Sequence, residues 1–186
     1  ISQHLNRSSR LTTLYHPARG RCTLTDKDET GSKNLSLKNT IGLPVINSAG
    51  GLVCNHSHHI LLMFKRGKWD MPKGRVESKQ SKPEAAMREV QEETGLDIDK
   101  LTIEGKLVST WHTTRHGNKK YLKKTHWYLM KYDGDDDDVS PQIEEGIIEC
   151  RWVPLSELPA YRALLKPRIN YVVDFWHSNL AYVPRN

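Results

Sequence analysis

The stretch GRVESKQSKPEAAMREVQEETGL, residues 74–96, contains a helix with clear signals at both ends. Ser81 and Glu84 have the spacing of a capping box, in which each side chain accepts a hydrogen bond from the other residue's backbone N–H group. A proline in the first turn is compatible with the start of a helix. Gly95 is typical of the residue that follows the last turn. The sequence therefore predicts a helix over residues 81–94.

The predicted helix carries three carboxylates on one face. At about 100° per residue, Glu89, Glu92 and Glu93 share one sector of about 100°, next to an apolar face with Ala86 and Val90. Like charges at this spacing destabilise a helix by roughly 0.2–0.5 kcal/mol per pair, and a divalent cation would offset their repulsion. On its own the helix favours an ordinary solvated acidic face. The flanking residues reverse that interpretation.

The flanking residues resemble the Nudix box, G-x5-E-x7-R-E-U-x-E-E-x-G-U, in which U is aliphatic. Eight of the nine defined positions match, namely Gly74, Arg88, Glu89, Val90, Glu92, Glu93, Gly95 and Leu96. The exception is Gln80, which can form hydrogen bonds but brings no charge, so the number of metal ions stays open. The surrounding strand pattern extends the resemblance over about residues 45–160. It implies a loop–helix–loop that binds Mg²⁺ or Mn²⁺ and hydrolyses a nucleoside diphosphate linked to another moiety.

The resemblance also implies a role for each site residue. Glu92 and Glu93 match the metal-binding glutamates of the family, and Glu89 matches the glutamate that acts as ligand or general base. Arg88 matches the arginine that orients these glutamates. The backbone carbonyl of Lys73 matches a further metal ligand. The residue types suit the reaction, because metal ions lower the pKa of bound water and a nearby carboxylate can accept its proton.

A basic loop, residues 65–75, leads directly into the box, and this position favours phosphate binding over a solvated surface. Its Trp-x-x-Pro-Lys-Gly segment resembles that of family members that act on long phosphate chains: diadenosine polyphosphate hydrolases, diphosphoinositol polyphosphate phosphohydrolases and messenger-RNA decapping enzymes. The tryptophan could stack on a base, but a structural tryptophan beneath the loop is at least as consistent with the sequence. The candidate substrate contacts are Arg66, Lys68, Trp69, Lys73 and Arg75.

Two later segments complete the predicted site. Residues 112–124 form a second basic cluster, from which Lys124 is a further candidate substrate contact, whereas the lone His112 favours a structural role. In many Nudix hydrolases a glutamate in a late loop supplies another metal ligand or the base. Glu144 and Glu145 are the candidates here, and we favour Glu145.

The order of elements predicts an α+β fold, a Nudix-like α/β/α sandwich with a mixed β-sheet between helices. Residues 1–44 form a polar N-terminal extension, with a candidate edge strand at residues 11–15 and a loop at residues 23–34. The resemblance implies a Nudix-like domain over residues 45–186, with a C-terminal helix. Predicted strands cover residues 45–54, 58–64, 101–113, 121–132 and 146–153, and further helices cover residues 156–165 and 169–180.

Composition limits the classes of protein. A net charge of +6 combined with many carboxylates in the middle of the chain favours a site for metal and polyphosphate over a uniform nucleic-acid surface. No apolar run approaches about 18 residues, so we expect no membrane span. The 3 cysteines are far apart and odd in number, which argues against a zinc site or disulfide framework and indicates a reducing, cytoplasmic compartment.

The sequence thus predicts a Mg²⁺- or Mn²⁺-dependent pyrophosphohydrolase whose partner is a small-molecule nucleoside or dinucleoside polyphosphate. Diphosphoinositol polyphosphates and RNA 5′ ends are alternative substrates, of which RNA is not favoured. A non-catalytic nucleotide-sensing module is a further alternative. We expect such a module to have lost metal-binding glutamates, which are intact here. The oligomeric state stays open, a dimer included.

Overall fold

The structure, a computed structural model, describes residues 25–28, 31–34 and 42–180. Its contacts group residues 1–46 with residues 111–124 in one unit, and residues 47–110 with residues 125–186 in a second. The first unit therefore includes part of the later chain. The domain boundary that the sequence predicts after residue 44 stays a prediction.

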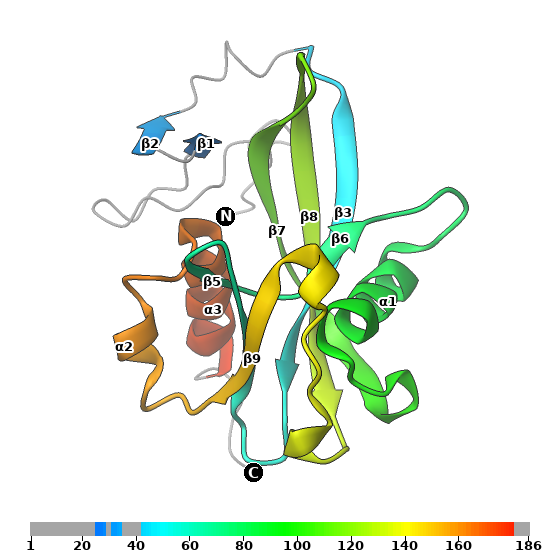
Figure 1. Cartoon of the computed structure of the whole chain (residues 1–186), viewed down its shortest axis with the longest axis vertical. Coiled ribbons are helices and arrows are strands. Elements are labelled where there is room, and N and C mark those ends of the chain that lie inside the picture. The colour runs from blue at the N-terminus through cyan, green and yellow to red at the C-terminus, as the bar shows by residue number, and fades with distance from the viewer. Residues whose placement is uncertain (1–24, 29–30, 35–41, 181–186) are drawn as a thin grey trace, which may run out of the picture. The chain divides into compact units, whose positions relative to one another are not determined.

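Seven strands form one sheet in the order β5-β4-β3-β8-β7, with β6 paired to β3 and β9 paired to β4 (Figure 1). Met63 of β4 lies opposite Asp70 of β5 and Cys150 of β9, both in antiparallel pairs. Strand β4 therefore lies between β5, which belongs to the basic segment, and β9, the last strand in the sequence. The strands are β3 Val45–Cys54, β4 Ile60–Lys65, β5 Lys68–Asp70, β6 Lys73–Arg75, β7 Leu101–His116, β8 Lys119–Tyr132 and β9 Ile147–Val153.

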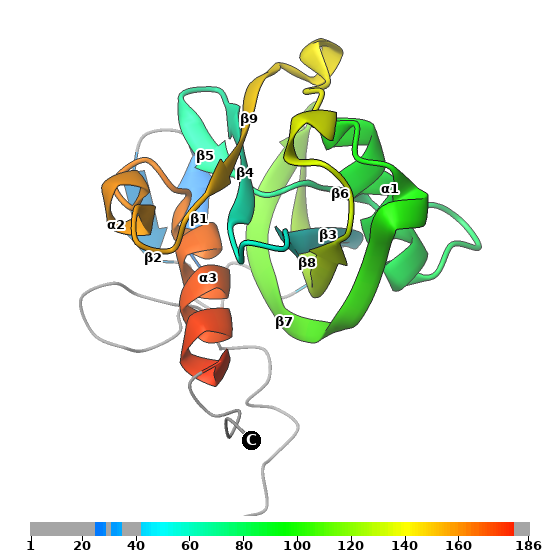
Figure 2. The ribbon, with the colours of Figure 1, turned by 90° about the horizontal axis from the view of Figure 1, so that it is seen from below.

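Helices cover opposite faces of the sheet within the second unit (Figure 2). Val90 of α1 shares one buried cluster with Val53, and Val172 of α3 shares a second buried cluster with Leu52. Neighbouring residues of β3 thus face different helices, as the alternation of side chains along a strand requires. The α+β sandwich is confirmed. The helices are α1 Lys82–Thr94, α2 Leu158–Tyr161 and α3 Pro167–Leu180, and no helix in the described ranges is long and apolar enough to cross a membrane.

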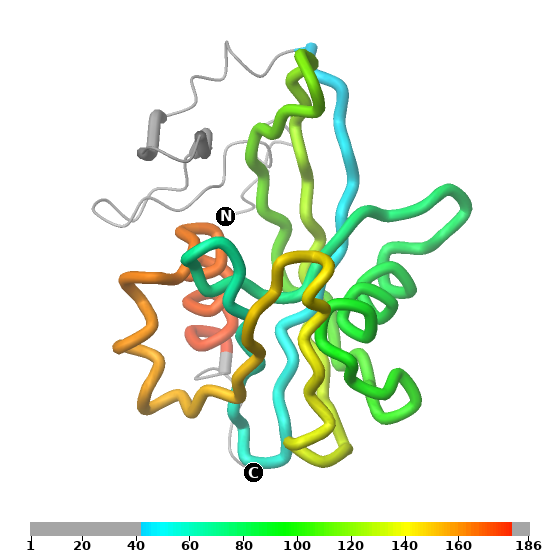
Figure 3. The backbone as a smooth tube through the Cα atoms, in the orientation of Figure 1, coloured from blue at the N-terminus to red at the C-terminus, as the bar shows by residue number. Residues whose placement is uncertain are grey.

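The basic loop is more ordered than the sequence predicts, because it contains β5 and β6. Figure 3 follows the backbone from β4 through these two short strands into α1. Gly74 of β6 pairs with Ala49 of β3, and Trp69 of β5 pairs with Phe64 of β4. The prediction of a continuous loop was wrong, since strands of three residues form here by pairing with longer neighbours and have no hydrophobic period of their own.

Two further local predictions were wrong. Strands β1 Thr25–Asp28 and β2 Gly31–Asn34 form an antiparallel pair within the predicted loop, because backbone pairing does not require an apolar pattern. The predicted helix at residues 156–165 is reduced to α2. Beyond α2 the Trp69 N–H donates to the Leu164 carbonyl at 2.9 Å, a tertiary bond that no local pattern indicates. The candidate edge strand at residues 11–15 lies outside the described residues.

Candidate active site

Helix α1 has both of the end signals that the sequence predicts. The Ser81 N–H donates to Glu84 Oε2 at 2.8 Å, and the Glu84 N–H donates to Ser81 Oγ at 3.4 Å. Gly95 has a φ of 73°, which favours glycine, and its N–H donates to the Gln91 carbonyl at 2.8 Å. The helix is therefore confirmed, and its C-terminal half carries the three glutamates of the predicted site.

Arg88 connects two of these glutamates. Its guanidinium donates to Glu89 Oε1 at 2.7 Å and to Glu92 Oε2 at 2.5 Å. It also donates to the Arg75 carbonyl of β6 at 2.9 Å. Burial raises the pKa of Glu89, which is 9% exposed, and the charge of Arg88 opposes that shift. Arg88 thus holds two carboxylates in fixed directions relative to β6.

Gly74, the first residue of the box, lies directly against Glu89. A Cβ atom at this position would lie 1.8 Å from Glu89 Oε2, far closer than real Cβ atoms approach other groups. The carboxylate can therefore occupy its place beside β6 only because the residue has no side chain.

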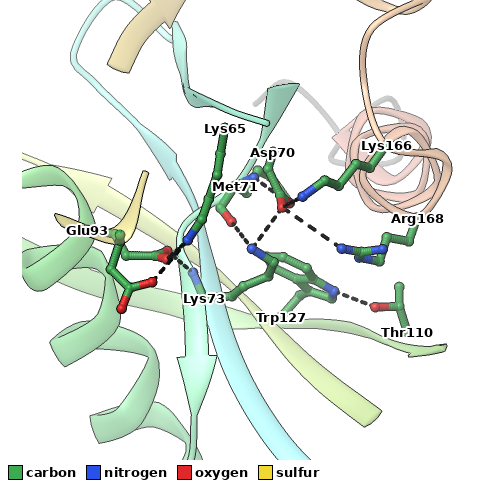
Figure 4. Close-up of polar contacts among 10 residues, drawn as sticks. Lys65, Asp70, Met71, Lys73, Glu93, Thr110, Trp127, Lys166 and Arg168 are labelled. Atoms are coloured by element: carbon green, nitrogen blue, oxygen red, sulfur yellow. Dashed lines mark hydrogen bonds and ion pairs between the residues drawn. The ribbon is translucent and has the colours of Figure 1, made fainter. Parts of the chain in front are cut away.

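Glu93 lies between two basic residues. Its Oε2 accepts a hydrogen bond from the Lys73 backbone N–H at 2.7 Å, and its Oε1 lies 3.7 Å from Lys65 Nζ (Figure 4). Burial raises the pKa of Glu93, although the charges of Lys73 and Lys65 oppose that shift. Lys65 Nζ also lies 3.2 Å from Glu145 Oε2. One ammonium group therefore lies between Glu93 and Glu145, and the late loop is brought to the carboxylate helix.

Lys73 contacts Glu93 through its backbone N–H, and its side chain reaches the fully buried Asp70 (Figure 4). Asp70 Oδ2 lies 2.9 Å from Lys73 Nζ, 2.5 Å from Lys166 Nζ and 3.9 Å from the Arg168 guanidinium. Burial alone would raise the pKa of Asp70, but these three cations hold it well below its usual range. The predicted contact between the Lys73 side chain and substrate phosphate stays a prediction, and this geometry does not favour it.

Trp69 is a buried residue of the fold. It is 7% exposed, and its ring centroid lies 5.0 Å from that of Phe64 and 5.2 Å from that of Tyr161. The packing agrees with the structural role that the sequence analysis left open. Stacking on a substrate base therefore has no support from the position of this ring.

The other predicted substrate contacts lie in two places. Arg66 and Arg75 are exposed and Lys68 is half-buried, all on the segment between β4 and α1. Lys124 belongs to the first unit, where its Nζ lies 4.7 Å from the Trp111 ring centroid. The segment before α1 thus carries three basic side chains that are at least partly exposed.

Gln80, the departure from the box, supports the loop before α1. Its Oε1 accepts a hydrogen bond from the Glu77 N–H at 3.3 Å and lies 3.5 Å from an Arg88 nitrogen donor. A glutamine can therefore perform the supporting role through its amide oxygen, without a charge.

Most of the potential metal ligands in the site are carboxylate oxygens, which are ligands that Mg²⁺ and Mn²⁺ prefer. Within the described residues, no three side chains from His, Cys, Asp and Glu are gathered around one point that could hold a metal ion. Arg88 and Lys65 hold the carboxylates instead. The donor set fits a divalent cation chemically, and such a cation would compete with these two basic residues.

Sequence reasoning missed four residues that organise the site: Lys65, Asp70, Lys166 and Arg168. The hydrogen bond between Lys166 and Asp70 joins residues 96 positions apart, so no local pattern could have linked them. One signal was present. Asp70 is the single acidic residue among the five basic residues of segment 65–75. Its location between Trp69 and Met71 indicates a buried, paired carboxylate.

Comparisons with known proteins agree with this geometry. The NUDIX domain family matches residues 44–174. The mutator protein MutT4 of Mycobacterium tuberculosis is 33% identical over 109 residues, a match that covers 56% of this chain but only 40% of that protein. An RNA pyrophosphohydrolase of Erythrobacter litoralis is 29% identical over 119 residues, which cover 54% of this chain and 73% of that protein.

Solved structures share the fold. The structure of a C. elegans Ap4A hydrolase covers 73% of this chain and 98% of its own, with a TM-score of 0.56 and 20% identity. A Nudix hydrolase of M. smegmatis, RenU, covers 88% of this chain and 96% of its own, with a TM-score of 0.57 and 16% identity. The family match extends over most of the chain and includes the box helix, its glycine and the late loop. The chain therefore belongs to the NUDIX domain family.

Proposed function

We propose that this protein is a Mg²⁺-dependent hydrolase that cleaves a phosphoanhydride bond in a nucleoside or dinucleoside polyphosphate. The observation that carries the proposal is the meeting of helix α1 and the late loop at one site. Helix α1 supplies Glu89, held by Arg88, and also Glu93, while the late loop supplies Glu145. The short distances from Lys65 to Glu93 and Glu145 support a shared cation site between these two carboxylates.

Each residue then has a defined task. Glu92, Glu93, Glu145 and the Lys73 carbonyl would hold the divalent cation, which when bound neutralises phosphate charge and lowers the pKa of coordinated water. Glu89 accepts a proton from the attacking water as the water oxygen bonds to phosphorus and the bridging P–O bond breaks. Arg88 keeps the Glu89 carboxylate oriented. The raised pKa of Glu89 suits a group that must accept a proton.

The basic residues before α1 that are at least partly exposed support a substrate with several phosphates. Arg66, Lys68 and Arg75 can contact phosphate oxygens that extend from the site. RNA 5′ ends are a second candidate substrate, because curated relatives bear the name RNA pyrophosphohydrolase. Diphosphoinositol polyphosphates remain the other alternative. The cytoplasmic location inferred from the cysteines belongs to the same proposal.

A substrate panel tests the proposal. A dinucleoside tetraphosphate, a nucleotide sugar, a triphosphorylated RNA and an inositol pyrophosphate would each be assayed with Mg²⁺ and with Mn²⁺. We expect the fastest turnover on the dinucleoside tetraphosphate, and a chelator should abolish it. Glu93→Gln should reduce the rate strongly. Glu84→Gln is the matched control on the same helix, since glutamine preserves a capping box. Turnover that persists with a chelator would contradict the proposal.

A Mg²⁺ titration assigns the general base. Loss of a metal ligand weakens metal affinity, so additional Mg²⁺ should recover part of the rate. Loss of the base lowers kcat even at saturating metal, by about 10²–10⁴-fold. We expect the larger loss at saturating Mg²⁺ for Glu89→Gln and a milder loss for Glu145→Gln. The reverse order would assign the base to Glu145.

A further inference from the structure

Asp70 and Lys73 close the segment before α1 into a local ring (Figure 4). The Met71 N–H donates to Asp70 Oδ1 at 2.9 Å. Lys73 Nζ lies 2.9 Å from Asp70 Oδ2 and donates to the Met71 carbonyl at 3.3 Å. The lysine ammonium is therefore fixed by a side chain and by the backbone of its own segment.

The same lysine holds Glu93 through its backbone. Its N–H donates to Glu93 Oε2 at 2.7 Å, while the Pro72 carbonyl beside it accepts the Gly51 N–H at 3.1 Å. A Cβ atom at Gly50 would lie 2.5 Å from Lys73 Cβ, so β3 closely limits the position of this residue. The direction of the Lys73 N–H is thus set on one side by β3 and on the other by the anchored side chain.

Asp70 is itself fixed by the segment that begins α3. Lys166 Nζ lies 2.5 Å and the Arg168 guanidinium 3.9 Å from its Oδ2. The Lys166 N–H also donates to the Trp69 carbonyl at 3.2 Å. Two cations already compensate one buried carboxylate. The third cation, Lys73, is therefore not needed to neutralise Asp70. The burial of the Lys73 ammonium beside Asp70 must have another role.

We infer that Lys73 is a positioning residue: anchored on Asp70, its side chain fixes the backbone N–H that orients Glu93, and thereby sets the metal affinity of the site. Its ammonium does not contact substrate. Asp70 is the anchor that connects this arrangement to α3. The inference rests on the proposed function, because Glu93 is assigned there as a metal ligand.

Lys73→Met tests the inference while Asp70 keeps Lys166 and Arg168 as partners. The affinity for Mn²⁺ alone, measured by electron paramagnetic resonance without substrate, should fall by up to about 10–100-fold, the range that is typical when a group that orients a metal ligand is lost. At limiting Mg²⁺ the kcat should fall. The KM at saturating Mg²⁺ should be unchanged for dinucleotides bridged by two, three or four phosphates. Lys73→Arg, which retains a cation for Asp70, should recover part of the Mn²⁺ affinity.

Lys166→Met is the matched control, because it removes another cation from the same carboxylate but has no bond to Glu93. Its Tm should fall, and its Mn²⁺ affinity should fall much less than that of Lys73→Met, because Arg168 and Lys73 still hold Asp70. An equal loss of Mn²⁺ affinity in both variants would overturn the inference, as would a KM that rises with phosphate number in Lys73→Met at unchanged Mn²⁺ affinity. If the wild type binds Mn²⁺ but cleaves no phosphoanhydride, the proposed function fails, and the comparison of Mn²⁺ affinities still decides the role of Lys73.

Discussion

Gly74→Ala should inactivate the protein without unfolding it. The added Cβ would lie 1.8 Å from Glu89 Oε2 and 2.0 Å from Cδ, whereas ordinary contacts begin at 3.4 Å. The carboxylate must then withdraw by about 1.6 Å, and a displacement of about 1 Å in an active site can cost about 10²-fold in rate. Because the clashing atoms form the end of a flexible side chain, rotation relieves the overlap. The free energy of unfolding should therefore fall by less than about 3 kcal/mol, the upper range for overpacking.

Initial rates on a dinucleoside tetraphosphate at saturating Mg²⁺, together with urea unfolding, would measure both effects. Gly105→Ala is the matched control, since a Cβ at Gly105 meets nothing within 4 Å. It should retain the wild-type rate. If Gly74→Ala kept more than half of that rate while remaining folded, the position of Glu89 beside β6 would not matter for the reaction, and the reasoning would be refuted.

Three other predictions concern buried ionisable groups. Asp70→Asn should lower the free energy of unfolding by about 3–5 kcal/mol in urea titrations, because it leaves buried cations without their carboxylate. The pKa of Asp70 is lowered in the folded state, so the ionised carboxylate contributes fully to the free energy of unfolding above its unfolded pKa of about 4, and this contribution is lost as the pH falls further. Asp70→Asn should therefore weaken the dependence of the free energy of unfolding on pH below about 4. Burial raises the pKa of the Cys54 and Cys150 thiols to about 12, so in a Cys22→Ser background both should react slowly with a thiol reagent until urea is added. Fast labelling of Cys54 in the native protein at mildly alkaline pH would contradict its observed burial.

Several features of the site needed tertiary structure. The sequence indicates a basic segment before α1 but does not separate Lys73, whose side chain binds Asp70, from Arg66 and Arg75, which are exposed. It also leaves open whether Trp69 contacts a base or the core, and the packing places the ring in the core. The order of charged residues along the chain does not show which of them form ion pairs, because the pairing of strands and the packing of helices bring the two partners together.

The sequence by itself determined α1, its capping box, its terminal glycine and the face shared by Glu89, Glu92 and Glu93, and it identified the family. These features rest on interactions between residues at most four positions apart, so the local sequence contains all of the information. Only the tertiary structure decided that Lys65 lies between Glu93 and Glu145, and that Lys166 binds Asp70 from 96 residues away. The contact of Lys65 with Glu145 follows from the pairing of β4 with β9, in which Lys65 lies opposite Ile147. The contact of Lys166 with Asp70 follows because the chain beyond β9 returns past Trp69 to begin α3, and neither event is encoded in a local pattern.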